Sequence, residues 1–204
     1  MKTHVLLLCL ALISPWLVRA GEPRDFFCTQ ATTLSMLTPD SVPRDGNLLS
    51  LRNLSWSAEF SAYVLVPVLE FDLSSVPKTA GIESAVLKLS FFGRGSSPMR
   101  PAIWIYPITS EWSAKSATWK DRPVWDENFA DVEAPPQEND DSAFWEMDIT
   151  PLVRKWVGGD MENHGLAIVA DPVRGDFHNF TFYGTLAGND LSPVLTITFD
   201  RNTQ

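Results

Sequence analysis

Short segments in which apolar and polar residues alternate recur along the chain, and they limit its fold more than any other feature. Leu87, Leu89 and Phe91 alternate with Lys88 and Ser90, which is the period of two of a half-buried β-strand. Similar runs between turn signals predict further strands. The expected strands cover residues 26–33, 48–56, 63–72, 87–91, 102–108, 144–149, 165–170, 180–184 and 194–199. Many short strands with turns between them are typical of an antiparallel β-sandwich.

One short helix is predicted near residues 150–157. Thr150 is a good N-cap, Pro151 suits the first helical position, and the glycines at 158–159 end the segment. Two turns of helix are too few for an α/β fold, so the sequence predicts a single all-β domain. Pro67 lacks a backbone donor, and we therefore expect the strand at 63–72 to lie at a sheet edge or to carry a bulge.

The first twenty residues have the pattern of a signal peptide. An apolar run of nine residues at 5–13 follows Lys2, and the small residue Ala20 ends the segment. A bilayer-spanning helix needs about 20 apolar residues, so the run is too short for one; the alternative is an uncleaved anchor. We expect residues 1–20 to be removed. Residues 21–204 would then form one domain that is secreted or displayed at the cell surface, with no membrane span.

The chain without this signal is strongly acidic. The full sequence has 16 basic and 25 acidic residues. Because Lys2 and Arg19 lie in the signal, the mature chain has 14 basic residues and a net charge of −11. Such a charge repels nucleic acid and anionic lipid, and it suits calcium or neutral and cationic polymers. Cys28 is then the only cysteine, so no internal disulfide can form.

Several segments follow one another in an informative order. They lie at residues 69–77, 82–89, 111–113, 119, 122–123, 148–150, 156–158, 163–168 and 192–197. This order resembles the DNRLRE domain family, which is similar to carbohydrate-binding module family 96, and the resemblance spans about residues 31–199. It implies a β-sandwich of jelly-roll type on secreted or surface proteins. It also implies frequent attachment to polysaccharide-active enzymes and, in some members, binding of polysaccharides such as alginate.

Aromatic residues are the main candidates for ligand contact. Trp104 and Tyr106 alternate with two isoleucines in the strand at 102–108, so the rings face outward if the isoleucines face the core. Exposed rings stack on sugar rings. Arg122 and Trp125 lie together in an acidic, proline-containing loop and form a second candidate pair. For other tryptophans we expect packing in the core instead: Trp112, Trp119 and Trp156.

Ion and glycan sites can also be proposed from the sequence. Asp171 and Asp176 flank a short loop, and they are the candidates for calcium because that ion takes oxygen ligands from loops. No histidine or cysteine ligands stand at a zinc spacing. Asn53 and Asn179 each begin an Asn-x-Ser/Thr sequon and are glycosylation candidates in a eukaryotic secretory route.

Three functions fit these features. The first is a non-catalytic module that binds polysaccharide or cell-wall and matrix material. The second is a structural or adhesive extracellular protein with a protein partner. The third is a polysaccharide hydrolase or lyase, since a glycosidase needs two carboxylates. Four carboxylates are candidates by type: Glu70, Asp72, Glu111 and Asp148. We assign no catalytic residue, because carboxylates in such positions usually bind turns or face solvent.

Overall fold

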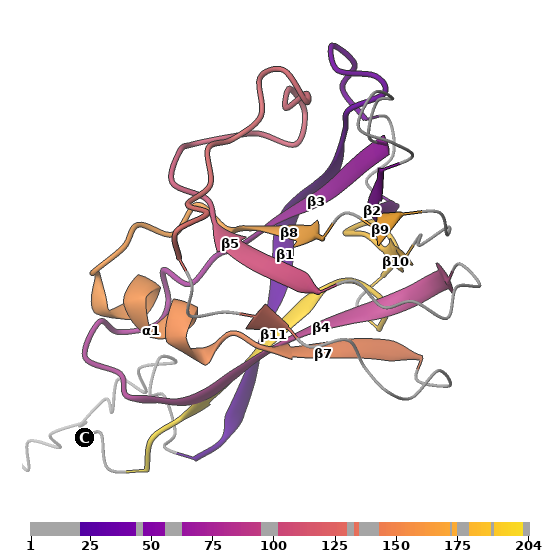
Figure 1. Ribbon diagram of the computed structural model, residues 1–204. Helices are drawn as coiled ribbons and strands as arrows, with labels where there is room; N and C mark the ends of the chain where they lie inside the picture. The colour runs from indigo at the N-terminus through magenta and orange to yellow at the C-terminus, as the bar shows by residue number, and fades with distance from the viewer. Residues whose placement is uncertain are drawn as a thin grey trace, which may run out of the picture.

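A computed structural model describes most of the chain (Figure 1). The described residues are 21–43, 47–55, 63–94, 102–129, 133–134, 143–171, 173–174, 180–188 and 190–201. The expected signal peptide at residues 1–20 lies outside them.

The described chain is all-β with one short helix. In chain order the elements are β1 (Pro23–Ser35), β2 (Leu48–Ser55), β3 (Tyr63–Phe71), β4 (Ile82–Arg94), β5 (Ile103–Pro107), β6 (Glu133–Ala134), β7 (Phe144–Asp148), α1 (Thr150–Gly158), β8 (Leu166–Ala170), β9 (Val173–Arg174), β10 (Phe180–Tyr183) and β11 (Val194–Phe199). The all-β class is therefore confirmed. The expected strands are all present, and within the described residues the sequence patterns missed the two-residue strands β6 and β9.

Six of the strands pair into a closed ring. The order around it is β3, β1, β11, β4, β10, β2 and back to β3. Further strands extend from it: β8, β5 and β6 follow one another outward from β3, β7 pairs with β4, and β9 pairs with β2. All pairs are antiparallel except β2 with β9. The ring is thus a barrel with added strands (Figure 1), whereas the sequence predicted a sandwich of two sheets.

Two strands that change partner close the ring. The first half of β1 pairs with β11 and its second half with β3, and the register shifts between Cys28 and Gln30. In the same way, β2 pairs first with β10 and then, from Arg52, with β3. Each strand therefore joins two parts of the ring, and the irregularity in β1 lies where a bulge bends a strand.

The core lies inside this ring and continues under α1. Alternate residues of β4 and β11 point into it, and Leu87, Leu89, Leu195 and Ile197 are fully buried. Trp156 of α1 joins the same cluster. Apolar burial of this kind is the main stabilising term of the fold.

The ends of α1 differ slightly from the expectation. The predicted N-cap, Thr150, is already helical, and Ile149 precedes it as the N-cap residue. The carboxylate of Asp148 accepts hydrogen bonds from both the backbone N and the hydroxyl of Thr150. Gly159 ends the helix in the left-handed conformation with φ of 84°, as the glycine pair predicted.

The expected edge position or bulge at Pro67 is wrong. β3 pairs with β1 along one edge and with both β2 and β8 along the other. The backbone N of Met36 donates to the carbonyl of Val64, so even-numbered residues of β3 point toward β1 and Pro67 points the other way. On that edge β2 pairs only as far as Leu65, and β8 begins at Val68. Proline therefore stands where β3 changes partner and no donor is needed.

Candidate carbohydrate-binding site

The outer face of β5 carries two aromatic rings that are only partly buried. Ile103 and Ile105 are buried in the core, at 1% and 0% exposure. The alternation of the strand therefore turns Trp104 and Tyr106 outward. Their ring centroids are 6.4 Å apart and the ring planes differ by only 5°. The outward orientation that the sequence predicted is thus present, and the two rings have parallel planes.

The end of β8 holds the indole of Trp104 in place. Trp104 Nε1 donates a hydrogen bond to Asp171 Oδ1 over 2.8 Å. Asp171 directly follows β8, whose residue Val169 pairs with Trp104 across the two strands. A hydrogen bond to a carboxylate restrains the indole more strongly than one to a neutral acceptor.

Tyr106 lies in a negatively charged environment. Its pKa is raised, first because the phenol is partly removed from water and then because the carboxylates of Glu127 and Asp171 repel the phenolate. Tyr106 therefore remains a neutral hydroxyl, able to donate and to accept hydrogen bonds, throughout the physiological pH range.

The loop after β5 brings Trp125 beside this strand. Ile108 and Trp125 form an isolated antiparallel bridge. Thr109 N also donates to Val124 O over 2.8 Å, and Val124 N donates to the hydroxyl of Ser110 over 2.9 Å. These bonds fix the returning segment at the end of β5. Trp125 Nε1 then donates to Glu127 Oε1 over 3.1 Å, and Glu127 is one of the two carboxylates that act on Tyr106.

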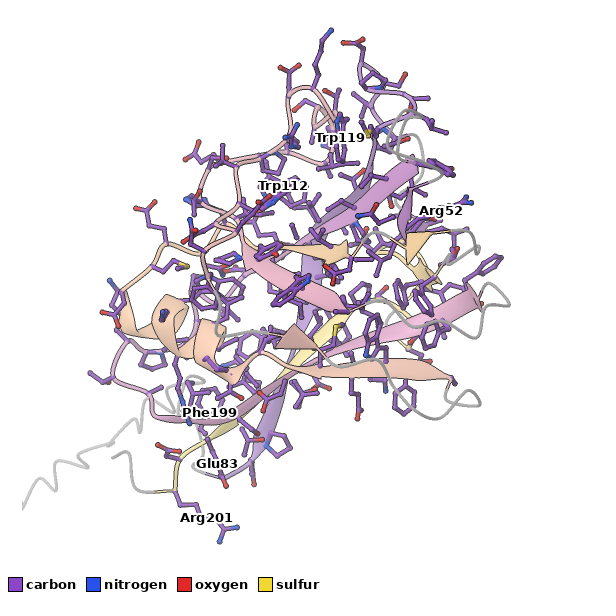
Figure 2. All side chains as sticks on the ribbon, in the orientation of Figure 1. Arg52, Glu83, Trp112, Trp119, Phe199 and Arg201 are labelled. Carbon is purple, nitrogen blue, oxygen red and sulfur yellow. The ribbon has the colours of Figure 1, made fainter. Side chains whose placement is uncertain are left out.

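The same loop covers a second apolar cluster on the outside of the sheet. Its buried members are Leu34, Val66, Val68, Ile108, Ala117 and Ala167. Trp112, Trp119 and Trp125 pack against it while remaining partly exposed. Figure 2 shows Trp112 and Trp119 in the loops beyond β3 and β5, away from α1. The packing role expected for these two tryptophans is present, but in this outer cluster; Trp156 lies in the main core.

Arg122 is fixed between two of these tryptophans. Its guanidinium carbon lies 5.0 Å from the centroid of the Trp119 ring and 5.5 Å from that of Trp125. Arg122 Nη1 also donates to the carbonyl of Trp119 over 3.1 Å. The four predicted contact residues therefore form two adjacent pairs, and Glu127 links them because it binds Trp125 and acts on Tyr106. We call Trp104, Tyr106 and Trp125 the aromatic face.

Comparison with known proteins identifies the family. The family model of carbohydrate-binding module family 96 matches residues 50–199. The chain belongs to this family. No curated protein matches the chain. The matched segment contains all of β3, β5 and β8 and the loop that covers the outer cluster, so the aromatic face lies within the family 96 domain.

Calcium binding at Asp171 and Asp176 of this family 96 module stays a prediction. Asp171 binds the indole of Trp104, and Asp176 lies outside the described residues. Among the residues that the structure describes, no three His, Cys, Asp or Glu side chains are grouped as metal ligands. The described part of the chain also holds no helix with the length and apolar character of a membrane span.

Of the two candidate glycosylation sites, the structure describes only the side chain of Asn53. Asn53 lies in β2, and its side-chain amide donates to the carbonyl of Ala170 over 2.8 Å. The nitrogen that a glycan would modify is therefore already bound to the strand that precedes Asp171. Asn179 lies outside the described residues. Glycosylation at both positions stays a prediction.

Two of the carboxylates considered for catalysis, Glu70 and Asp72, have structural partners in this module. Glu70 Oε2 accepts a hydrogen bond from Gln30 Nε2. Asp72 Oδ1 accepts one from Ser74 N over 2.8 Å. This bonding to Ser74 lowers the pKa of Asp72, the opposite of the raised pKa that a general acid requires. The role in turns that was expected for Asp72 is therefore observed.

Proposed function

We propose that the protein is a secreted, non-catalytic module that binds extracellular polysaccharide or cell-wall material through the aromatic face. The observation that carries this proposal is the pair of parallel, partly buried rings of Trp104 and Tyr106 on the outer face of β5. Such rings would otherwise be covered, since exposing them leaves apolar area in water. Membership of a carbohydrate-binding family supports the same ligand class.

The chemistry of the face suits a sugar chain. The C–H groups on one side of a pyranose ring pack against an aromatic ring, and they bury apolar area there. Hydroxyl groups at the edge of the sugar need polar partners. Asp171 and Glu127 are exposed and each has a carboxylate oxygen beyond the one that binds an indole. Tyr106 adds a neutral hydroxyl, so apolar and polar contacts are available together.

Retention on immobilised or soluble polysaccharides tests the proposal. We expect the purified protein to be retarded by at least one neutral polysaccharide in an array. The Trp104→Ala, Tyr106→Ala double variant should lose that retention, because it removes both rings. The matched control is Phe92→Ala, which removes a 58% exposed ring from β4. Equal retention of the double variant and the wild type would exclude this face as the binding surface.

Secretion is a separate part of the proposal, and it rests on the signal pattern at residues 1–20. Expression of the full chain in a secreting host, followed by N-terminal sequencing of the exported protein, tests it. We expect the exported chain to begin at Gly21. An exported or cell-bound chain that still begins at Met1 contradicts cleavage.

The alternative function is a structural or adhesive protein with a protein partner. That interpretation predicts buried rings at Trp104 and Tyr106, and their partial exposure favours the glycan binder. A hydrolase or lyase requires a shifted pair of carboxylates in a cleft, and Asp72 shifts in the wrong direction for an acid. The jelly-roll type of the strand connections and calcium binding by the module stay predictions from the sequence.

A further inference from the structure

We propose that a cavity between the end of β3 and the end of α1 is a second glycan site, which holds one sugar unit by its hydroxyl groups. Its volume is about 370 Å³, at the lower end of the range for ligand pockets, roughly 300–1,000 Å³. It therefore has room for one sugar unit rather than for an extended chain. Among the described residues that line the cavity, none belongs to the aromatic face. The inference rests on the proposed function only for the class of ligand.

Three segments of the chain form the walls of this cavity. Glu70 lies at the end of β3, and Asp72 and Lys78 lie in the segment that connects β3 to β4. Figure 1 shows this segment passing α1 on its way to β4. Trp156 and Val157 of α1 close the inner side. Because Asp72 and Lys78 are exposed while the two residues of α1 are buried, the cavity has a charged rim and an apolar floor.

The floor of the cavity carries a hydrogen-bond donor without an acceptor. Trp156 is only 6% exposed, and among the residues that the structure describes its indole nitrogen has no hydrogen-bond partner. A buried donor without an acceptor costs free energy, and such groups are rare in native proteins. A ligand hydroxyl in the cavity would supply the missing acceptor. This donor points to a ligand, because packing in the core requires only the rings of Trp156.

Hydrogen bonds within the protein hold the two carboxylates of the cavity in place. Glu70 Oε2 accepts from Gln30 Nε2, and Asp72 Oδ1 accepts from Ser74 N. The bonding to Ser74 lowers the pKa of Asp72, so this carboxylate is ionised at neutral pH. A carboxylate can accept about four hydrogen bonds, and both therefore keep acceptor capacity for a ligand. Groups that are positioned before binding lose less entropy when the ligand arrives.

Lys78 adds a donor to the rim. A Cβ atom built on Gly159 would lie 3.6 Å from Lys78 Nζ, so the ammonium group stands beside the C-terminal end of α1, where the helix dipole favours a cation. The cavity thus offers donors and acceptors together. The hydroxyls of a sugar match both, since each donates once and accepts twice, and the C–H face of the sugar ring packs on an apolar floor.

NMR titration of the indole N–H signals tests the inference. The probes are the β-methyl glycosides of glucose, mannose and mannuronic acid, each a single sugar unit, and the matching β-1,4-linked hexasaccharides. A ligand of about a dozen non-hydrogen atoms binds with a Kd of about 1 mM at ordinary ligand efficiency, so the titration extends to about 10 mM. The signal of Trp156 is the one that Trp156→Phe lacks, and this variant keeps an aromatic ring in the core.

Two variants with the same chemical changes are compared. The test variant is Asp72→Asn, Lys78→Met, in which an amide oxygen still accepts from Ser74 N. The matched control is Asp40→Asn, Lys120→Met, which changes an exposed ion pair of 2.7 Å whose two residues do not line the cavity. Affinities of the two variants come from any indole signal that moves, so the comparison does not depend on the assignment of Trp156.

The outcomes separate the inference from the proposed function. We expect at least one methyl glycoside to shift the Trp156 signal in the wild type and in the control, and to bind the test variant about tenfold or more weakly, because hydrogen bonds to charged groups are lost. A hexasaccharide that shifts the same signal identifies a chain end as the ligand, and a shift with methyl glycosides alone identifies a free sugar; both support the site. No shift of the Trp156 signal with any probe, or equal affinities of the test and control variants, overturns the inference. Failure of the proposed function shows separately, as a Trp104 signal that no hexasaccharide shifts.

Discussion

Replacing Gly165 by alanine should force apart the two strands that support the aromatic face. Gly165 precedes β8 and has φ of 86°. A Cβ atom there would lie 2.0 Å from the carbonyl oxygen of Leu69 and 2.9 Å from the Cα of Glu70, both backbone atoms of β3. No change of rotamer can relieve this overlap. Gly165 is also tied in place, because its N donates to Asn163 Oδ1 and its carbonyl accepts from Ile108 N.

The loss of stability can be estimated from two contributions. An alanine held in the left-handed region costs about 1–2 kcal/mol. Relief of the overlap moves β8 away from β3, where Leu166 and Leu69 pair and both are fully buried. Partial exposure of buried leucine adds about 2–3 kcal/mol. The expected decrease in the free energy of unfolding is therefore about 3–5 kcal/mol.

Urea denaturation followed by tryptophan fluorescence measures this decrease, and two other glycines provide controls. Gly188 has φ of 90°, but a Cβ added there would meet nothing within 4 Å, so Gly188→Ala should show only the conformational cost of about 1–2 kcal/mol. Gly93 has neither a positive φ nor a close neighbour, so Gly93→Ala should change stability by less than about 0.5 kcal/mol. Equal losses at Gly165 and Gly188 would refute the role assigned to the β3–β8 contact.

Two further predictions concern the main core, one at the partly buried Cys28 and one at the buried Ile105. Burial raises the pKa of Cys28 to about 12, and its thiol donates to Gln30 O over 3.1 Å. The unfolded thiol ionises above pH ~8.5 while the folded one stays neutral, so the free energy of unfolding should fall from that pH toward pH 12. Cys28→Ala should show a shallower fall in the same denaturation series, and an identical slope contradicts the argument. Ile105 is fully buried beneath the aromatic face, and Ile105→Ala should lower the free energy of unfolding by about 2–5 kcal/mol; a loss below about 1 kcal/mol would mean that β5 is not anchored through it.

Strand positions could be predicted from the sequence because alternation is a local property. The pattern of Leu87 and Leu89 has the same meaning wherever β4 lies in the sheet, and the structure confirms it. Closure of the ring is not local. It depends on the change of partner within β1, at the register shift between Cys28 and Gln30, and no residue type there signals it. The error at Pro67 has the same origin, since a missing donor indicates an unpaired backbone position but not whether the whole strand is unpaired.

The candidate site, too, could be predicted from the sequence only where a local pattern determines it. Alternation along β5 was sufficient to turn Trp104 and Tyr106 outward. The role of Asp171 was not predictable, because its partner Trp104 lies 67 residues earlier in the chain and the two meet only when β8 pairs with β5. Glu127 was missed although it stands two residues from Trp125, since an acidic residue in an acidic loop carries no distinguishing signal.

The loop after β5 determines where the aromatic face ends. The outer cluster includes Leu34 and Val66, and Val169 and tryptophans of the loop pack against it. Trp125 stands at the boundary: it packs on the covered cluster, and its indole nitrogen binds Glu127 at the open side. Packing on the cluster and binding at the face are therefore coupled through one residue. A change at Trp125 should disturb both, whereas a change at Trp104, which is not part of the outer cluster, should disturb binding alone.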